Sequence, residues 1–433
     1  MALTNTFVQG PVSTADRVSN IHAESWNPEV HVQMAYERYP MMTILDEMSK
    51  NDATIKSRKH HWFNEAYNSY SGTITDVYTN ASLATAYSSG AVAGSVVFLK
   101  LPSADVKQIR EGDGILINNT TNNTLLVGNV TSSVATGSDS TSYVAVKMLT
   151  ADTGSDLALT TLQWSLQADA QAEGSELPVG VSFDPTEYEN QSQIFMEAVE
   201  HTGSEVAESE RINGTKVARD LKAAMTRFKM KQEWTYMFGK TYTTTGSNSK
   251  PKRFMQGAYW ALQDKASANI IDWRTASGYS GSWASSGLNW LKQIALDAST
   301  YSENSVKMAF CGNAAWQAIN DAVEDRGYFK LETRQNAFGI RIKTLVGLTQ
   351  DWNLILSPTM STRKFANSIF VTEAGLLRKK VFRKLRFIKP RERDEDGYIF
   401  VDGKKQGWME ESTLEYVNMA SQYWLDGIGF DHS

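Results

Sequence analysis

The sequence is poor in cysteine, with Cys311 as the one thiol among 433 residues. A single cysteine excludes an internal disulfide and fits a reducing compartment. No apolar run is long enough to predict a membrane-spanning helix. The first residues, "MALTNTFVQGPVSTADR", lack the basic start and the apolar core of a secretory signal peptide. These absences predict a soluble protein of the cytosol.

Catalytic and cofactor motifs are also missing. The chain contains no GxSxG, HExxH, Walker loop, GxGxxG or CxxC sequence. His60 and His61 are adjacent, and adjacent side chains of a strand point to opposite faces, so we do not expect them to bind one metal. Cys311 lies in the apolar run "MAFCG", which predicts a buried hydrophobe rather than a nucleophile. The sequence therefore predicts neither an enzyme nor a cofactor or metal site.

Basic residues are absent from one long stretch and concentrated in another. Between Met148 and Glu210 there is no Lys or Arg, whereas thirteen Asp or Glu occur. Residues 376–393, "LLRKKVFRKLRFIKPRER", contain nine Lys or Arg and one Glu, in a chain whose net charge is −5. Such runs are typical of solvated faces, of nucleic-acid contacts, or of pairing within and between molecules. Apolar residues interleave with the basic ones, which favours a packed strand over a phosphate-binding tail.

The periodicity of apolar residues predicts a mixed α+β protein. Between Val92 and Leu166, four or five short alternating strands separated by turn sequences predict a small β-barrel or sandwich lobe. The segment "TKVARDLKAAMTRFKMKQEWTYMFGK" predicts a long helix that ends at Gly239. Helices and strands then alternate along the chain.

Two shorter helices are predicted with named buried faces. In "YPMMTILDEMSK", Met41, Ile44, Leu45 and Met48 recur at helical spacing. In "SGLNWLKQIALDAST", the inward residues are predicted to be Leu288, Leu291, Ile294 and Ala295.

The serial order of these parts resembles the major capsid proteins of tailed phages. The resemblance is carried by "NQSQIFMEAVEHTGSEVAE", which leads into the long helix ending "EWTYMFGK", and by "KRFMQGAYWAL" after it. It continues in "FGIRIKTLVG", "LILSPTM" and "IFVTEAGLLRKKVFR", while "YPMMTILDEM" and "HHWFNEA" match the arm and first strand of the family. It covers most of residues 35–425.

The resemblance implies the capsid fold of tailed phages and herpesviruses, an α+β fold with an inserted β lobe. The expected parts are an N-terminal arm at 1–55, an extended loop at 56–200 carrying the β lobe at about 92–168, a spine helix at 203–239, a peripheral lobe at 240–283 and 378–433, and an axial lobe at 284–377.

The resemblance further implies a structural function without an active site. Such proteins form hexamers and pentamers of an icosahedral head around double-stranded DNA, which they contact non-specifically at the inner face. The implied partners are other copies, a portal and a scaffold or decoration protein, with no membrane; the implied place is the virion, assembled in the host cytoplasm. The sequence leaves open a virion-associated DNA-binding or packaging accessory, or a tail or decoration protein.

In this family the extended loop of one subunit lies across the peripheral lobe of its neighbour. The uneven charge of the chain therefore predicts a contact between copies, in which exposed pairs are each worth only about 0–1 kcal/mol. The predicted pairing joins the basic residues Arg378, Lys379, Lys380, Arg383, Lys384 and Arg386 to the acidic residues Glu173, Glu176, Asp184, Glu187 and Glu189.

Overall fold

The chain divides into two compact units in a computed structural model. Unit 1 comprises residues 1–62 and 187–433, and unit 2 comprises residues 63–186. The structure describes residues 39–48, 54–65, 70–158, 161–171, 173–174, 180, 185–202, 204, 207, 216–302, 304–326, 330–337, 340–346, 349–362, 364–388 and 403–432. No helix among them is long and apolar enough to cross a membrane.

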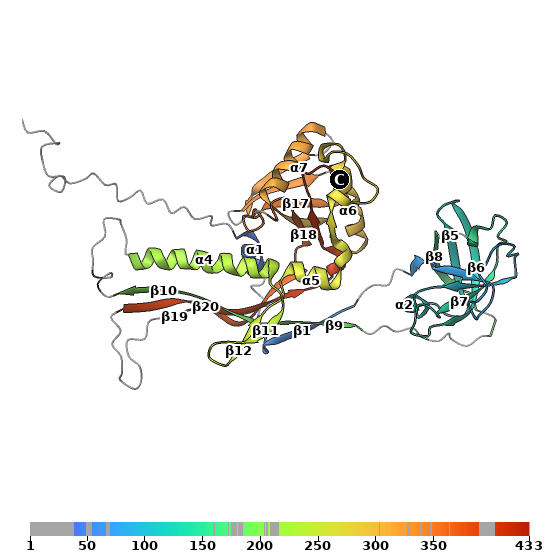
Figure 1. Ribbon diagram of the computed structural model, residues 1–433, viewed down its shortest axis with the longest axis horizontal. Coiled ribbons are helices and arrows are strands. Elements are labelled where there is room, and N and C mark those ends of the chain that lie inside the picture. The colour runs from blue at the N-terminus through green and yellow to red at the C-terminus, as the bar shows by residue number, and fades with distance from the viewer. Residues whose placement is uncertain are drawn as a thin grey trace, which may run out of the picture. The chain divides into compact units, whose positions relative to one another are not determined.

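Unit 1 contains a mixed seven-stranded sheet with the order β13-β21-β18-β14-β17-β16-β15. Its strands are β13 (Ile270–Asp272), β14 (Val306–Cys311), β15 (Lys330–Ala337), β16 (Ile340–Val346), β17 (Asp351–Leu356), β18 (Ile369–Glu373) and β21 (Tyr423–Asp426). β14 runs parallel to β17 and antiparallel to β18. The helices α6 (Trp283–Thr300) and α7 (Asn313–Arg326) pack against this sheet (Figure 1).

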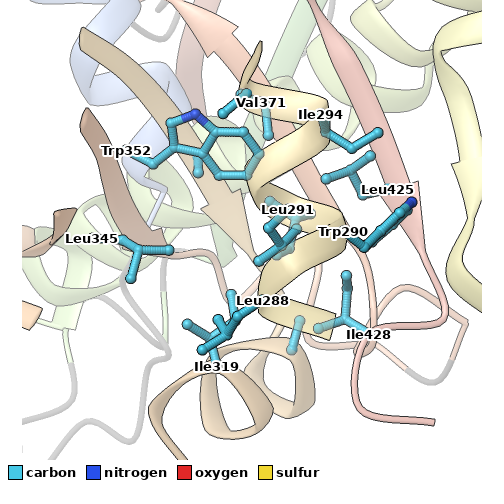
Figure 2. Packing of buried hydrophobic residues seen from close by; sticks show 14 of the residues in the cluster. Leu288, Trp290, Leu291, Ile294, Ile319, Leu345, Trp352, Val371, Leu425 and Ile428 are labelled. Atoms are coloured by element: carbon cyan, nitrogen blue, oxygen red, sulfur yellow. The ribbon is translucent and has the colours of Figure 1, made fainter. Parts of the chain in front are cut away.

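Alternate residues of the central strands enter two separate hydrophobic clusters. On β14, Ala309 and Cys311 join the cluster with α6 and α7, whereas Phe310 joins the other cluster. Figure 2 shows Leu288 and Leu291 of α6 among the side chains of the first cluster. The sheet is therefore buried on both faces, as its almost unbroken apolar strands require.

The second cluster of unit 1 lies between a long helix and a three-stranded sheet. The helix is α4 (Lys216–Phe238), and the sheet has the order β10-β20-β19. Its strands are β10 (Gln193–Thr202), β19 (Leu377–Ile388) and β20 (Gly403–Tyr416), and they run alongside α4 (Figure 1). On β10 the alternation is visible, because Phe195 is buried while Met196 is exposed.

Smaller elements complete unit 1. The helices α1 (Pro40–Met48) and α5 (Ala258–Lys265) pack in the second cluster. The remaining strands form two two-stranded sheets: β1 (Lys59–Asn64) with β9 (Thr186–Gln191), and β11 (Tyr242–Thr245) with β12 (Pro251–Phe254).

Unit 2 is built on one antiparallel sheet with the order β2-β8-β5-β6-β7-β4-β3. Its elements are β2 (Ser71–Thr73), β3 (Asp76–Tyr78), β4 (Val96–Lys100), α2 (Ser103–Val106), β5 (Asp113–Asn119), β6 (Thr124–Val134), β7 (Tyr143–Met148) and β8 (Leu162–Asp169). Only Ile74 and Thr75 separate the two edge strands, and their amides bond to Leu162 and Lys100 on opposite sides. The sheet therefore curls until its edges meet, around a core of its own.

The structure confirms the mixed α+β class. It also confirms the predicted inward residues of α6, which are at most 3% exposed. The long helix starts at Lys216, and most of the predicted range 203–215 lies outside the described residues. The division into arm, extended loop, spine, peripheral lobe and axial lobe stays a prediction.

Candidate assembly interface

The basic strand β19 pairs with β20. Carboxylates of β20 lie beside the basic side chains of β19. Glu415 of β20 lies opposite Arg378, whose guanidinium donates to it at 3.3 Å. The Lys380 ammonium lies 3.6 Å from the same carboxylate, and His60 Nε2 of β1 lies 2.5 Å from it. Burial pushes the pKa of Glu415 up, but these three neighbours hold it below its usual value. One buried carboxylate thus contacts three basic groups.

Two further basic residues of β19 also have partners inside the chain. Arg383 Nε donates to Glu411 at 2.6 Å, and the other oxygen of Glu411 accepts from Ser192 at 2.7 Å. Lys379 is 4% exposed and lies 2.7 Å from Asp46 of α1 and 2.5 Å from Glu410. These pairs bind β19 to β20 and to α1, so they stabilise the subunit itself.

Only the far end of β19 presents basic groups without a carboxylate partner among the described residues. Lys384 and Arg386 are exposed, and the Arg386 guanidinium rests on the Met409 sulfur at 3.8 Å. The β19–β20 register shifts on either side of Arg383, which ends the regular alternation of this strand. Lys384 and Arg386 are therefore the two predicted basic residues that remain available to another molecule.

The predicted acidic residues have local partners or lie in other parts of the chain. A Glu187 carboxylate oxygen lies 2.8 Å from His61 Nδ1, and Glu189 lies 3.1 Å from Lys59 Nζ. Glu173 is exposed. Glu176 and Asp184 lie outside the described residues. Among the predicted residues that the structure describes, no basic–acidic pair is in contact within one chain. The contact between copies stays a prediction.

A groove of about 640 Å³ opens between β10 and the β11–β12 hairpin. Its lining combines three basic residues, Lys250, Lys252 and Arg253, with Glu411 and with apolar residues such as Phe254. The hairpin is held to β10 and the strand before it, since Gln193 accepts from the Met255 amide at 3.0 Å. The three basic side chains of this groove are complementary to an acidic segment.

A buried carboxyl group in α4 was not predicted from the sequence. Glu233 is 0% exposed and accepts from the Met42 amide of α1 at 3.3 Å and from the Thr359 hydroxyl at 2.7 Å. Burial raises the pKa of Glu233 to about 7, against the lowering effect of these hydrogen bonds. Its helical neighbours Gln232 and Tyr236 are also buried.

The structure shows what surrounds the three residues considered for catalysis or metal binding, Cys311, His60 and His61. Cys311 is fully buried, as predicted, and burial raises the pKa of its thiol. His60 and His61 contact different carboxylates, Glu415 and Glu187, as expected for adjacent residues of a strand. Among the described residues, no group of three or more His, Cys, Asp or Glu side chains is placed to hold a metal ion.

Several solved structures are similar to this chain. An encapsulin complex from Synechococcus elongatus shares 13% identity, with 57% of this chain and 76% of that one covered and a TM-score of 0.37. A structure from Mycobacterium phage Bobi shares 6% identity, with 59% and 79% covered and a TM-score of 0.39. The capsid of cyanophage P-SCSP1u shares 10% identity, with 60% and 80% covered and a TM-score of 0.38. No curated protein matches the chain.

The match to a family model extends over nearly the whole chain. The model described as the SU10 major capsid protein matches residues 11–429. This range contains all of unit 2 and most of unit 1. The chain therefore belongs to the SU10 major capsid protein family and is a structural protein of a bacteriophage capsid shell.

Proposed function

We propose that this capsid protein assembles into hexamers and pentamers, which close into an icosahedral head around double-stranded DNA. The observation that carries the proposal is the family match over residues 11–429. Supporting it, α4 against the three-stranded sheet suits a spine helix and peripheral lobe, and the seven-stranded sheet with α6 and α7 suits an axial lobe. Unit 2 then belongs to the extended loop.

The proposed partners follow from this assembly. Each subunit contacts other copies, one vertex holds a portal, and a scaffold or decoration protein takes part where the phage encodes one. Assembly takes place in the host cytoplasm, and the DNA is held without sequence specificity. The chain has no enzymatic role in this proposal, which the structural nature of its family supports.

The ion pairs inside the subunit limit which basic residues are available for a contact between copies. Arg378, Lys379, Lys380 and Arg383 each have a carboxylate within 3.6 Å, so they already have partners inside the subunit. We assign the acidic part of a neighbouring extended loop to the exposed end of β19 and to the basic groove beside the β11–β12 hairpin. Since exposed pairs are weak, they orient the copies more than they hold them together.

The assembly is tested by expressing the chain, alone and with the structural proteins of its phage, and examining purified particles by electron microscopy. We expect hexameric rings or closed shells. The variant Lys384→Glu with Arg386→Glu is expected to lower the shell yield and to change its salt dependence, because it reverses two exposed charges without breaking a pair inside the subunit.

The matched control is Lys265→Glu with Lys292→Glu, which reverses two exposed basic residues of α5 and α6. Equal yields for both variants would contradict the assigned contact while leaving the shell function intact. Stable monomers of the unchanged chain under every condition tested would contradict the shell itself.

A further inference from the structure

A second basic region lies on α4 and the segment that follows it. Residues 216–265 contain eleven Lys or Arg and three Asp or Glu, a net charge of +8. This equals the net charge of residues 376–393, but it is spread over 50 positions, so no dense run marks it in the sequence. The basic groups of β19 are mostly neutralised within the subunit, which raises the question of whether those of α4 are.

Arg227 and Lys231 stand one helical turn apart on the exposed side of α4. Their side chains are 52% and 65% exposed, and both bond to the same carboxylate, Glu197, which is 11% exposed beneath them. Burial pushes the pKa of Glu197 up, but Lys231 and Arg227 together hold it below its usual value. Because two cations share one carboxylate, the site keeps a net positive charge toward solvent. The shared carboxylate also fixes the positions of the Arg227 guanidinium and the Lys231 ammonium.

Aromatic rings continue this side of α4 and hold further lysines. Trp234 is 36% exposed and packs 5.4 Å from Phe238, measured between ring centroids. Beyond the helix, Lys240 Nζ lies 4.2 Å from the centroid of the Trp260 ring. A lysine ammonium group over the face of an aromatic ring is attracted to the ring by a cation–π interaction, which partly fixes its position.

A fourth basic residue belongs to the same surface. Phe238 stacks on Phe365 at 4.4 Å between centroids, and Lys364 Nζ lies 5.4 Å from the centroid of that ring. We name Arg227, Lys231, Lys240 and Lys364 the spine-helix basic surface. Lys240 and Lys364 are exposed and have no carboxylate partner in the described ranges.

We propose that the spine-helix basic surface binds the phosphate backbone of duplex DNA, and that this side of unit 1 faces the packaged genome; the inference rests on the proposed shell around DNA. Duplex DNA carries one negative charge per about 1.7 Å of axis, and α4 from Arg227 to its end is about 17 Å long. The helix thus spans about ten phosphates. Two of the rings, Trp260 and Phe365, lie under lysines instead of presenting free faces, which favours backbone contact over stacking on unpaired bases.

The charge of the rest of the chain agrees with this assignment. Unit 2 contains four Lys or Arg and twelve Asp or Glu, a net charge of −8, so it repels a phosphate backbone. On β19, Arg378, Lys379, Lys380 and Arg383 already have carboxylate partners. On the spine-helix basic surface, Arg227 and Lys231 share the carboxylate of Glu197, and Lys240 and Lys364 have none among the described residues.

The test measures how binding of a fluorescent duplex of about 20 base pairs to the full chain depends on salt. The variant is Arg227→Gln with Lys231→Gln and Lys240→Gln. The control, Lys107→Gln with Lys147→Gln and Lys405→Gln, removes three exposed lysines elsewhere. We expect the slope of log affinity against log salt to fall by about 3 in the variant, with affinity lowered on the order of tenfold or more. The control should bind like the unchanged chain.

The other outcomes overturn the proposal. An unchanged slope in the variant would do so, as would an equal loss in the control. A loss caused instead by Lys384→Gln with Arg386→Gln would move the contact to β19. If the variant binds DNA normally but no longer forms shells, the surface binds a neighbouring copy. DNA binding and shell formation are separate measurements, so failure of the shell function is recognised in the unchanged chain.

Discussion

At the scale of the residue, Glu233 is a carboxyl group without exposed surface that joins three segments. It accepts from α1 and from the Thr359 and Ser357 hydroxyls after β17. Because its pKa of about 7 in the folded chain exceeds the ordinary 4.5, the folded state binds this proton more tightly than the unfolded state. The stability from this proton is fully present below about pH 4.5 and is lost as pH rises through about 7.

Glu233→Gln is therefore expected to flatten the pH dependence of stability. Between pH 5 and 8, the unfolding free energy of the unchanged chain should fall relative to that of the variant by at most about 3 kcal/mol. Urea unfolding of the unassembled chain at several pH values measures this. Glu324→Gln, on the exposed side of α7, is the control. A variant that is less stable by the same amount at every pH would show that the carboxylate acts only as a hydrogen-bond acceptor.

At the scale of the element, α1 is fixed near both of its ends. Glu233 accepts from its first turn, and Asp46 near its end lies 2.7 Å from both Lys229 of α4 and Lys379 of β19. Burial pushes the pKa of Asp46 up, but Lys379 and Lys229 hold it below its usual value. A lowered pKa means that this stabilisation is present above about pH 4 and is lost as pH falls.

Removing the charge of Asp46 should loosen α1. Asp46→Asn leaves Lys229 and Lys379, both largely buried, with weaker partners, at a cost of about 2 kcal/mol after allowing for the partial exposure of Asp46. We expect faster hydrogen exchange of the α1 amides, measured by mass spectrometry. Asp321→Asn on α7 serves as the matched control. Unchanged exchange in α1 would mean that its apolar face alone holds it.

The apolar face of α1 was predicted only in part from the sequence. Met41 and Leu45 are buried as predicted, but Met42 is buried as well, at 0% exposed, and Ile44 is only half-buried. The reason is that α1 packs between α4 and β19 instead of on one flat surface. Helical periodicity shows which residues share a face, and the number of neighbours decides how wide that face is.

At the scale of the whole molecule, the two units have separate cores. The cluster of unit 2 contains only residues between Ile74 and Trp164, and both clusters of unit 1 lie outside it. The two edge strands of unit 2 are joined through Ile74 and Thr75, so its sheet has closed on itself. A closed sheet with its own core has what independent folding requires.

Residues 63–186 are therefore expected to fold as a separate fragment. The fragment should unfold cooperatively on heating and give a dispersed amide NMR spectrum. Gly128→Val is the control, because a Cβ at Gly128 would lie 2.2 Å from a Val146 methyl and the core has no room for it. A disordered fragment without the substitution would show that unit 2 depends on unit 1.

The sequence by itself determined the mixed class, the buried face of α6, the burial of Cys311 and the serial order that indicates a capsid protein. These follow from apolar periodicity and local composition, which depend on neighbours along the chain. The tertiary structure decided which charges remain free. The carboxylates that neutralise β19 come from positions 28, 37 and 333 residues away, in Glu411, Glu415 and Asp46. Pairs at such distances depend on strand register and helix docking, and this is why the densest basic run in the sequence carries fewer free charges than its composition indicates.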